Sequence, residues 1–229
     1  NDGYTFGDLL VDLDKTGIAR IRYTTSHPRD LDDKTIEAMA KCPSVMPQLP
    51  LPVQSGDDEV LRRMNRKYTH DHYMGLIHKL KSAIPGISIT TDIIVGFPGE
   101  TEEQFQNTLK LVDEVEYEGA YTFIYSPREG TPAAMFEDQI PEDIAKDRLY
   151  RLNEKVNDYY LKGNERFVGT IQEVLVDGES KNGEGMMCGY TKNLKLCHFK
   201  SDDKSLVGKL VNVKITEAKS WFVIGELCE

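Results

Sequence analysis

The sequence predicts an α/β chain in two parts, an incomplete barrel of strands and helices followed by a small barrel made only of strands. Up to about residue 135, apolar runs typical of buried strands alternate with segments of helical periodicity. Beyond Gly163, short strands are separated by glycine-rich turns. We therefore expect a first domain at residues 1–163 and a second at 164–229.

Four strands are expected in the first part, near residues 20–25, 47–53, 88–95 and 120–126. The third is the clearest buried strand, from Ile87 to Val95, and Gly96-Phe-Pro-Gly99 ends it. Successive strand–helix units give parallel strands, whose carboxyl ends carry the functional groups in barrels and open sheets. Candidate site residues are therefore sought where these strands end.

Helix signals separate the predicted strands. Thr5 to Asp8 and Thr101 to Gln104 are capping boxes that open two helices. Other helices are expected at about 32–41, from Asp57, around 73–80, and from Pro141 to Lys162 with the proline at the first helical position. In the second part, strands are expected at 168–176, 211–215 and 221–225, and Asp177-Gly178 is interpreted as a turn.

Charge and composition limit the function classes. The net charge of −10 argues against a generic nucleic-acid binder. Nearly all the excess acid lies before residue 164, so the second part is close to neutral and can carry a local basic patch. No apolar stretch reaches membrane-spanning length and the first residues are polar, which predicts a cytoplasmic protein without a membrane partner. Since the first residue is not Met, we expect further residues upstream.

The cysteines predict no metal site. Cys42, Cys188, Cys197 and Cys228 have no partner at C-x-x-C spacing, and the five histidines complete no metal pattern. Scattered reduced thiols in a cytosolic protein are the expected state.

Five blocks in order resemble MiaB-type tRNA methylthiotransferases, a family of radical-SAM enzymes. Four are Arg20-Ile-Arg-Tyr-Thr-Thr-Ser-His-Pro-Arg29, Leu51-Pro-Val-Gln-Ser-Gly56, Thr91-Asp-Ile-Ile-Val-Gly-Phe-Pro-Gly-Glu-Thr101 and Phe123-Ile-Tyr-Ser-Pro-Arg128. The fifth, with Val174-Leu-Val-Asp-Gly178, is similar to the TRAM domain that ends these enzymes. The resemblance implies an incomplete TIM-like radical-SAM (β/α) barrel followed by an OB-like TRAM barrel, in a carboxy-terminal fragment.

The same resemblance implies the chemistry. Such enzymes use S-adenosyl-L-methionine and two [4Fe–4S] clusters to methylthiolate C2 of N6-isopentenyladenosine beside the anticodon of tRNA. An electron donor and a sulfur source are implied partners. The family's cluster cysteines, including a C-x-x-x-C-x-x-C loop, have no counterpart here. We therefore expect no catalytic or metal-binding residue in this chain, and no activity from it alone.

Residues at the strand ends are the candidates for binding S-adenosylmethionine. By resemblance they are Gln54, Ser55, Asp92, Ile94, Gly96, Tyr125 and Ser26. Structural roles compete with this one: Ser55 is expected to cap the next helix, Gly96 to serve a tight turn, and Tyr125 is as often a core residue. An acid in a run as apolar as Ile-Ile-Val needs a partner, and for Asp92 we favour function. Glu100 is expected to cap the following helix.

RNA contacts are expected from Arg128 and from loops of the second part. Arg128 is a candidate for substrate phosphate, with a surface salt bridge as the alternative. The loop candidates are Lys181, Lys192, Asn193 and Lys195, with a solvated lysine-rich surface as the alternative.

Two other functions stay open at this point. A sister methylthiotransferase would act on threonylcarbamoyl-adenosine in tRNA or on a ribosomal protein. A protein of another class would be an inactive RNA-binding module.

Overall fold

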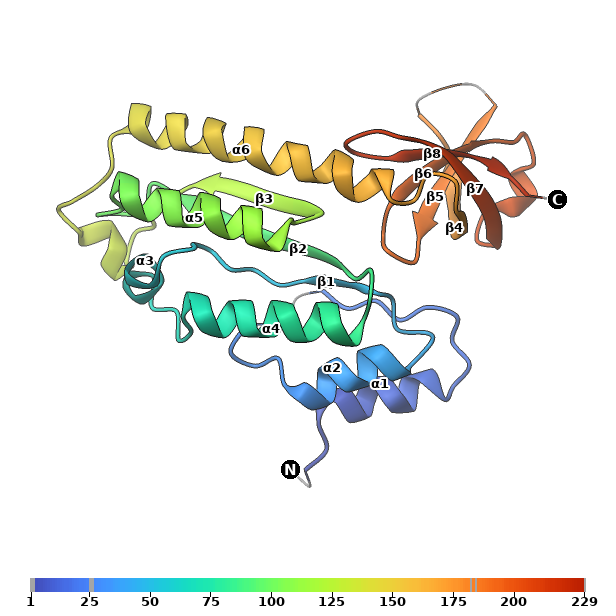
Figure 1. The fold of residues 1–229 in the computed structure, drawn as a ribbon, viewed down its shortest axis with the longest axis horizontal. Coiled ribbons are helices and arrows are strands. Elements are labelled where there is room, and N and C mark those ends of the chain that lie inside the picture. Colours follow the sequence, from blue (N-terminus) through green and yellow to red (C-terminus); the bar gives the residue numbers. More distant parts are fainter. Residues whose placement is uncertain (1–2, 25–26, 182, 184, 229) are drawn as a thin grey trace.

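The computed structural model describes residues 3–24, 27–181, 183 and 185–228. It contains a three-stranded parallel sheet with helices packed on it, then a long helix that leads into a closed five-stranded barrel (Figure 1). The α/β fold with a second, all-β barrel is therefore confirmed. No helix in these described ranges is long and apolar enough to cross a membrane.

The sheet has the order β1-β2-β3, with both pairs parallel. Its strands are β1 (Gln48–Pro50), β2 (Ser88–Val95) and β3 (Gly119–Ile124). The strand predicted near 20–25 is wrong: within its described residues only Ile21 forms a bridge, parallel to Val45. The reason is a local bend in the partner segment, where the Gln48 amide donates to the Met46 carbonyl and so leaves the ladder.

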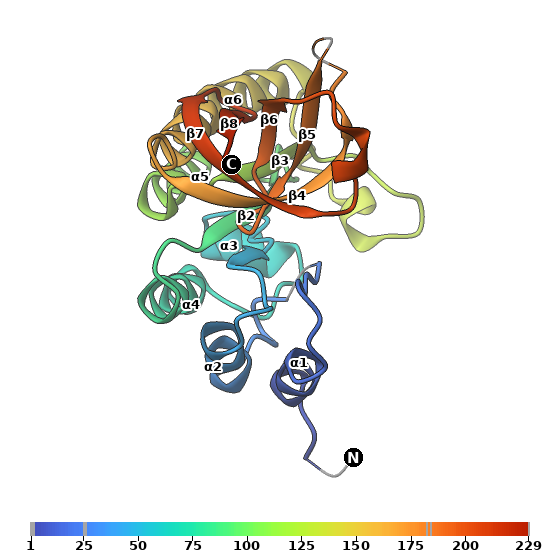
Figure 2. The ribbon, with the colours of Figure 1, turned by 90° about the vertical axis from the view of Figure 1, so that its right-hand side faces the viewer.

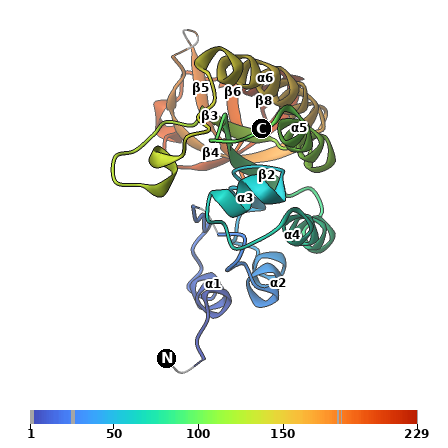
Figure 3. The same ribbon diagram turned by 90° about the vertical axis from the view of Figure 1, so that its left-hand side faces the viewer.

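Helices cover one face of this sheet and leave the other open. They are α1 (Phe6–Asp14), α2 (Asp33–Lys41), α3 (Asp58–Arg63), α4 (His70–Ala83), α5 (Glu102–Val115) and α6 (Glu142–Glu165). Figure 3 shows α2, α4, α5 and α6 along the same side of the sheet. On β2 the side chains of Ile89, Ile93 and Val95 are buried toward the helices. Thr90, Asp92 and Ile94 alternate with them and are only partly buried, so they face the open side.

Both predicted capping boxes are present. Thr5 and Asp8 close the start of α1, and Thr101 and Gln104 close the start of α5. At α6 the proline prediction is one position off, since Pro141 is the residue before the first helical one.

The second part closes into a barrel with the strand order β4-β5-β6-β8-β7 (Figure 2). The strands are β4 (Ile171–Glu179), β5 (Met186–Thr191), β6 (Leu196–Lys200), β7 (Leu210–Ala218) and β8 (Val223–Leu227). The short 3₁₀ helix η2 (Lys204–Leu206) precedes β7. The barrel has its own apolar core, which includes Val174, Phe199 and Val213. The predicted turn at Asp177-Gly178 is wrong, because the pairing shifts register there and β4 continues through a bulge.

Polar contacts join the barrel to the amino-terminal end of the sheet. Asn164, near the end of α6, donates to the carbonyl oxygens of Lys219 and Ser220 in the β7–β8 turn. The Glu118 carboxylate, just before β3, lies 2.8 Å from Lys195 Nζ and 2.7 Å from an Arg166 nitrogen. Helix α6 continues through Gly163 to Glu165, so the domain boundary near Gly163 stays a prediction.

Candidate functional site

A cavity of about 660 Å³ lies at the carboxyl ends of the strands; we call it the carboxyl-end cavity. It is walled by the segments after β2 and β3, by the loop after α3, and by the 3₁₀ helix η1 (Pro132–Met135). Of the predicted site residues the structure brings five together here: Gln54, Asp92, Ile94, Tyr125 and Arg128. Their neighbours in the wall include Arg63, Asn65, Arg66, Phe97 and Phe123.

Gln54 is held in a strained backbone conformation at the cavity wall. Its φ is 73°, in the left-handed region that residues with a side chain rarely adopt. Its amide donates to the Asp92 carbonyl at 2.9 Å, and its carbonyl accepts from the Ile94 amide at 2.9 Å. These two bonds to β2 hold Gln54 in the strained conformation. Backbone strain of this kind is concentrated at ligand sites.

Asp92 places a carboxylate on the open face of β2. No hydrogen bond or ion pair reaches this side chain from the described residues, so the partner expected from the sequence is not found. Partial burial raises the pKa of the Asp92 carboxyl above its ordinary value. An unpaired, partly desolvated carboxylate is therefore available to a ligand that donates hydrogen bonds.

Tyr125 lines the cavity. Its ring packs against a neighbouring aromatic side chain, whereas its hydroxyl has no hydrogen-bond partner among the described residues. The ring packs edge-on against Phe97, with 4.9 Å between the centroids. The hydroxyl is buried and finds no hydrogen-bond partner in the described part of the chain. The ring therefore packs on a neighbouring aromatic side chain, and contact of this residue with S-adenosylmethionine stays a prediction.

Two arginines in the wall were missed by sequence reasoning. Arg63 donates to Asp138 at 2.7 Å and lies over the Phe136 ring, so it is paired. Arg66 forms no ion pair with any described residue, and its Nε atom is buried without a partner. Arg63 ends α3 and Arg66 follows it, one short helix beyond the strand ends at which site residues were expected. The sequence signal for a turn here is Asn65, a residue type that tolerates the left-handed conformation. Its φ is 59°.

Three expectations near this cavity need correction. Ser55 does not cap α3, because the Asp57 carboxylate accepts from the Glu59 and Val60 amides instead. Gly96 serves the turn as expected, at φ 70°, but it is not in the cavity wall. Glu100 does not cap α5, since Thr101 does. Ser26 lies outside the described residues.

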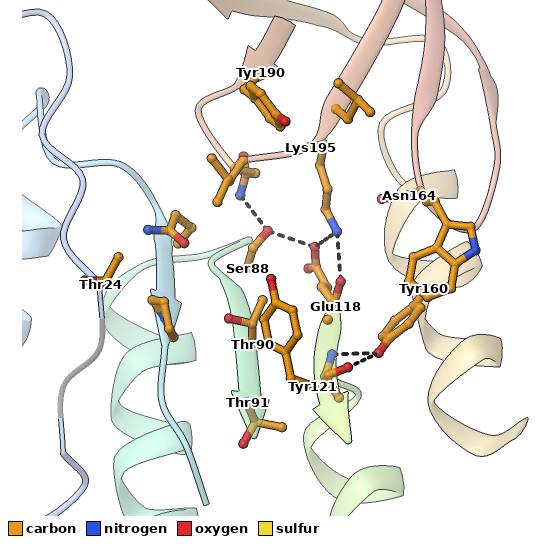
Figure 4. A pocket seen from close by; sticks show the side chains of 18 of the residues that line it. Thr24, Ser88, Thr90, Thr91, Glu118, Tyr121, Tyr160, Asn164, Tyr190 and Lys195 are labelled. Carbon is orange, nitrogen blue, oxygen red and sulfur yellow. Dashed lines mark hydrogen bonds and ion pairs between the residues drawn. The ribbon is translucent and has the colours of Figure 1, made fainter. Parts of the chain in front are cut away.

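A second hollow of about 660 Å³, the junction cavity, lies between the sheet and the barrel (Figure 4). Asp92 lines both cavities. Figure 4 shows Ser88, Glu118 and Lys195 linked around one wall, and Tyr121 and Tyr160 on another. Tyr121 is 67% exposed, whereas Lys195 is only 8% exposed.

The loop residues predicted to bind RNA divide into two groups. Asn193 donates to the Gly86 and Pro47 carbonyls, and Lys195 pairs with Glu118, so both hold the barrel against the sheet. Burial lowers the pKa of the Lys195 ammonium, and Glu118 opposes that shift. Both residues lie in the loop between β5 and β6, as expected, but Lys195 is not part of a solvated lysine-rich surface. Lys192 is more exposed and lies 3.9 Å from Glu173, and Lys181 lines a shallow hollow beside η2.

Cysteine placement gives no metal centre within the described ranges, where no three His, Cys, Asp or Glu side chains are grouped to hold an ion. All four thiols are free. Cys197 lies in the barrel core, and burial raises its pKa to about 12.

Comparisons with known proteins agree with this architecture. Residues 1–112 match the Radical SAM superfamily, and residues 165–228 match the TRAM domain. The chain is 55% identical over 226 residues to a tRNA-2-methylthio-N(6)-dimethylallyladenosine synthase of Bacillus cytotoxicus. A synthase of the same name from Geobacillus kaustophilus is 54% identical over 224 residues. Over nearly its whole length the chain is similar to these MiaB-type synthases.

The match covers 99% and 98% of this chain but only 44% and 42% of those two relatives. The chain therefore spans less than half the length of the curated relatives it matches. Among solved structures, coproporphyrinogen III oxidase of Escherichia coli, a radical SAM enzyme, aligns with a TM-score of 0.52. That alignment covers 72% of this chain and 39% of the oxidase at 18% identity, so it supports the fold alone.

Proposed function

We propose that the whole protein methylthiolates C2 of N6-isopentenyladenosine beside the anticodon of tRNA, as a radical-SAM enzyme. The observation that carries this proposal is the 55% identity to a synthase whose name states that product, over 99% of this chain. The C2–H bond is unreactive toward acids and bases, so cofactor chemistry is needed and the protein contributes positioning. S-Adenosylmethionine supplies radical chemistry and the methyl group when it is bound.

We place S-adenosylmethionine in the carboxyl-end cavity. Three polar groups there have no partner from the described residues, which are the Asp92 carboxylate, the Tyr125 hydroxyl and the Arg66 Nε. A nucleoside joined to an amino acid carries hydroxyl, amine and carboxylate groups that suit such a set. Gln54 and Ile94 contribute wall contacts, and Tyr125 presents a ring edge and a hydroxyl to the adenosyl part. Ser55 acts only indirectly, by supporting the loop next to Gln54.

The iron–sulfur clusters do not fit the residues described here. Two [4Fe–4S] clusters belong to the proposal for the whole protein, but no thiol group in the described ranges is arranged for one. No step of the reaction is assigned to them in this chain. The electron donor and the sulfur source likewise belong to the whole protein.

RNA contact is assigned to Arg128 at the cavity and to Lys181 and Lys192 on the barrel. Lysine and arginine side chains on exposed loops bind phosphates and fix the register of an RNA without reading its sequence. Asn193 and Lys195 contribute by fixing the barrel, within a second domain proposed for residues 164–229. A cytoplasmic location follows from a tRNA substrate.

Nucleoside analysis of tRNA from cells lacking the gene tests the proposal. The 2-methylthio derivative of isopentenyladenosine should disappear and the unthiolated nucleoside should accumulate, with restoration by the wild-type gene. Loss of a threonylcarbamoyl derivative instead would identify a sister enzyme. Unchanged tRNA nucleosides would favour a ribosomal-protein substrate or an inactive RNA-binding module.

A further inference from the structure

A buried ion pair closes the turn that follows β2. The side chains of Glu100 and Arg148 are 0% and 5% exposed. Arg148 Nη1 donates to Glu100 Oε2 at 2.8 Å and to the Glu100 carbonyl at 2.8 Å. The same Oε2 accepts the Gly96 amide at 2.7 Å. One carboxylate oxygen therefore links the first residue of the turn to helix α6.

This turn carries part of the cavity wall. Phe97 is 5% exposed, lines the carboxyl-end cavity and packs edge-on against Tyr125. Helix α6 lies directly against the turn, because a Cβ on Gly96 would come within 2.8 Å of the Ala145 Cβ. The position of the turn on α6 therefore sets where Phe97, and with it the Tyr125 ring, stands.

The pair is a poor source of stability. Glu100 Oε1 and Arg148 Nε are both buried without a hydrogen bond in the described structure. Burial raises the pKa of the Glu100 carboxyl, while the Gly96 amide and the Arg148 cation act against that shift. Incompletely satisfied buried pairs contribute little net stability compared with apolar residues. The pair instead fixes the orientation of the Glu100 carboxylate, and with it the hydrogen bond from the Gly96 amide.

We propose that Arg148 is a positioning residue of the carboxyl-end cavity, which aims the Glu100 carboxylate at Gly96 and so keeps Phe97 behind Tyr125. The inference rests on the proposed function only for the identity of the ligand. The geometry of the turn is independent of it.

The chain supplies a matched control three residues further along α6. Arg151 forms two hydrogen bonds with Glu102, at 2.8 and 2.9 Å, and so joins α6 to the first residue of α5. This pair is exposed, with 33% and 54% of the side chains accessible; Glu102 Oε2 also lies 3.8 Å from Arg148 Nε, but in the described structure neither Arg151 nor Glu102 bonds to Gly96. R151M therefore removes an α5–α6 ion pair without touching Gly96.

Two measurements on the 229-residue chain test the proposal. The first is hydrogen exchange of the amides from Gly96 to Thr101, and the second is the affinity for S-adenosylhomocysteine by calorimetry. R148M should speed exchange of these amides by about tenfold or more and weaken binding by about tenfold, whereas R151M should change each by less than about twofold. The double variant E100Q/R148M removes the buried charge together with the arginine, so residue 100 is still not aimed at Gly96 and both losses should remain.

Equal effects of R148M and R151M would overturn the proposal. So would a double variant that recovers wild-type exchange, since the uncompensated Glu100 charge, and not the lost direction of its side chain, would then explain the effect of R148M. If R148M does not fold, comparison of the double variant with R151M decides, because faster exchange at Gly96 in the double variant supports the proposal and wild-type-like exchange refutes it. If the wild-type chain does not bind S-adenosylhomocysteine, the ligand assignment fails while the exchange data still judge Arg148.

Discussion

The polar groups at the two ends of the three-stranded sheet differ in how far they are paired. At the amino end, the Glu118 carboxylate receives Lys195, Arg166 and the Ser88 hydroxyl. At the carboxyl end, the described structure leaves the Tyr125 hydroxyl and the Arg66 Nε without partners. Buried polar groups are normally paired, so unpaired ones need an explanation. The Glu118 cluster is a structural joint, and we propose that a ligand completes the hydrogen bonding of the unpaired groups at the carboxyl end.

The strongest test of the joint is Glu118→Gln. It leaves the Lys195 ammonium, only 10% exposed, without its counter-charge. Removing one partner of a buried pair costs about 3–5 kcal/mol, so the barrel should detach or unfold at lower denaturant. Urea unfolding followed by Trp221 fluorescence reports this, because the only tryptophan packs against Tyr160 of α6.

Lys79→Met is the control for that experiment, since it breaks an exposed pair with Asp33. Its cost should be about 1 kcal/mol or less. Equal midpoints for the two variants would show that the amino end is not a stabilising joint.

A pair of tyrosine variants compares the two ends directly. Tyr160→Phe removes a hydroxyl that accepts from the Ala120 amide and donates to the Ala120 carbonyl, so it should cost about 1 kcal/mol or somewhat more. Tyr125→Phe removes a hydroxyl without a protein partner, so the free energy of unfolding should stay within about 0.5 kcal/mol.

Affinity for S-adenosylhomocysteine should show the reverse order. Loss of one ligand hydrogen bond at Tyr125 should weaken binding by about three- to tenfold, and Tyr160→Phe should leave it unchanged. Calorimetry on both variants gives the answer. A larger binding loss at Tyr160 would place the ligand at the junction cavity.

The Asp92 carboxylate predicts a pH-dependent difference. Burial raises its pKa in the folded state, so the stability that the protonated form contributes is lost as the pH rises through that pKa. Asp92→Asn should therefore unfold at higher urea than the wild type at pH 7 and at nearly the same urea at pH 3. A difference that does not change with pH would mean that desolvation of this carboxylate is negligible.

The smallest effect is expected at the exposed α5–α6 pair. Hydrogen bonds and charge from Arg151 lower the pKa of Glu102 to about 2, so the pair stabilises the fold above the ordinary carboxyl pKa. That contribution is lost as the pH falls toward 2. Solvent screening limits it to about 1 kcal/mol, so thermal unfolding of R151M should differ slightly from wild type at pH 7 and not at pH 2.

Local patterns predicted the parts of the fold that depend on neighbouring residues. The capping boxes at Thr5 and Thr101 formed, and the apolar run before Gly96 became β2. Polar groups at the carboxyl ends of parallel strands were expected to lie together, and Gln54, Asp92 and Tyr125 do line one cavity.

The misses depend on contacts between distant segments. From the sequence Lys195 is expected on the surface, but packing of the barrel on the sheet buries it against Glu118, 77 residues earlier in the chain. Asp177-Gly178 has turn chemistry, yet pairing with β5 absorbs it as a bulge. Ser55 lost the cap of α3 because Asp57 is also a strong capping residue and lies directly before the first helical residue.

The closed barrel makes its last strand unusually important. β8 pairs antiparallel with β7 on one side and parallel with β6 on the other, so it is the closing segment of the ring. Without Val223–Leu227, two rows of backbone donors and acceptors would become free at once, and the apolar interior would open to solvent. Such unpaired edges are templates for intermolecular strand pairing. A chain shortened by a few residues at this end would therefore aggregate instead of merely losing stability.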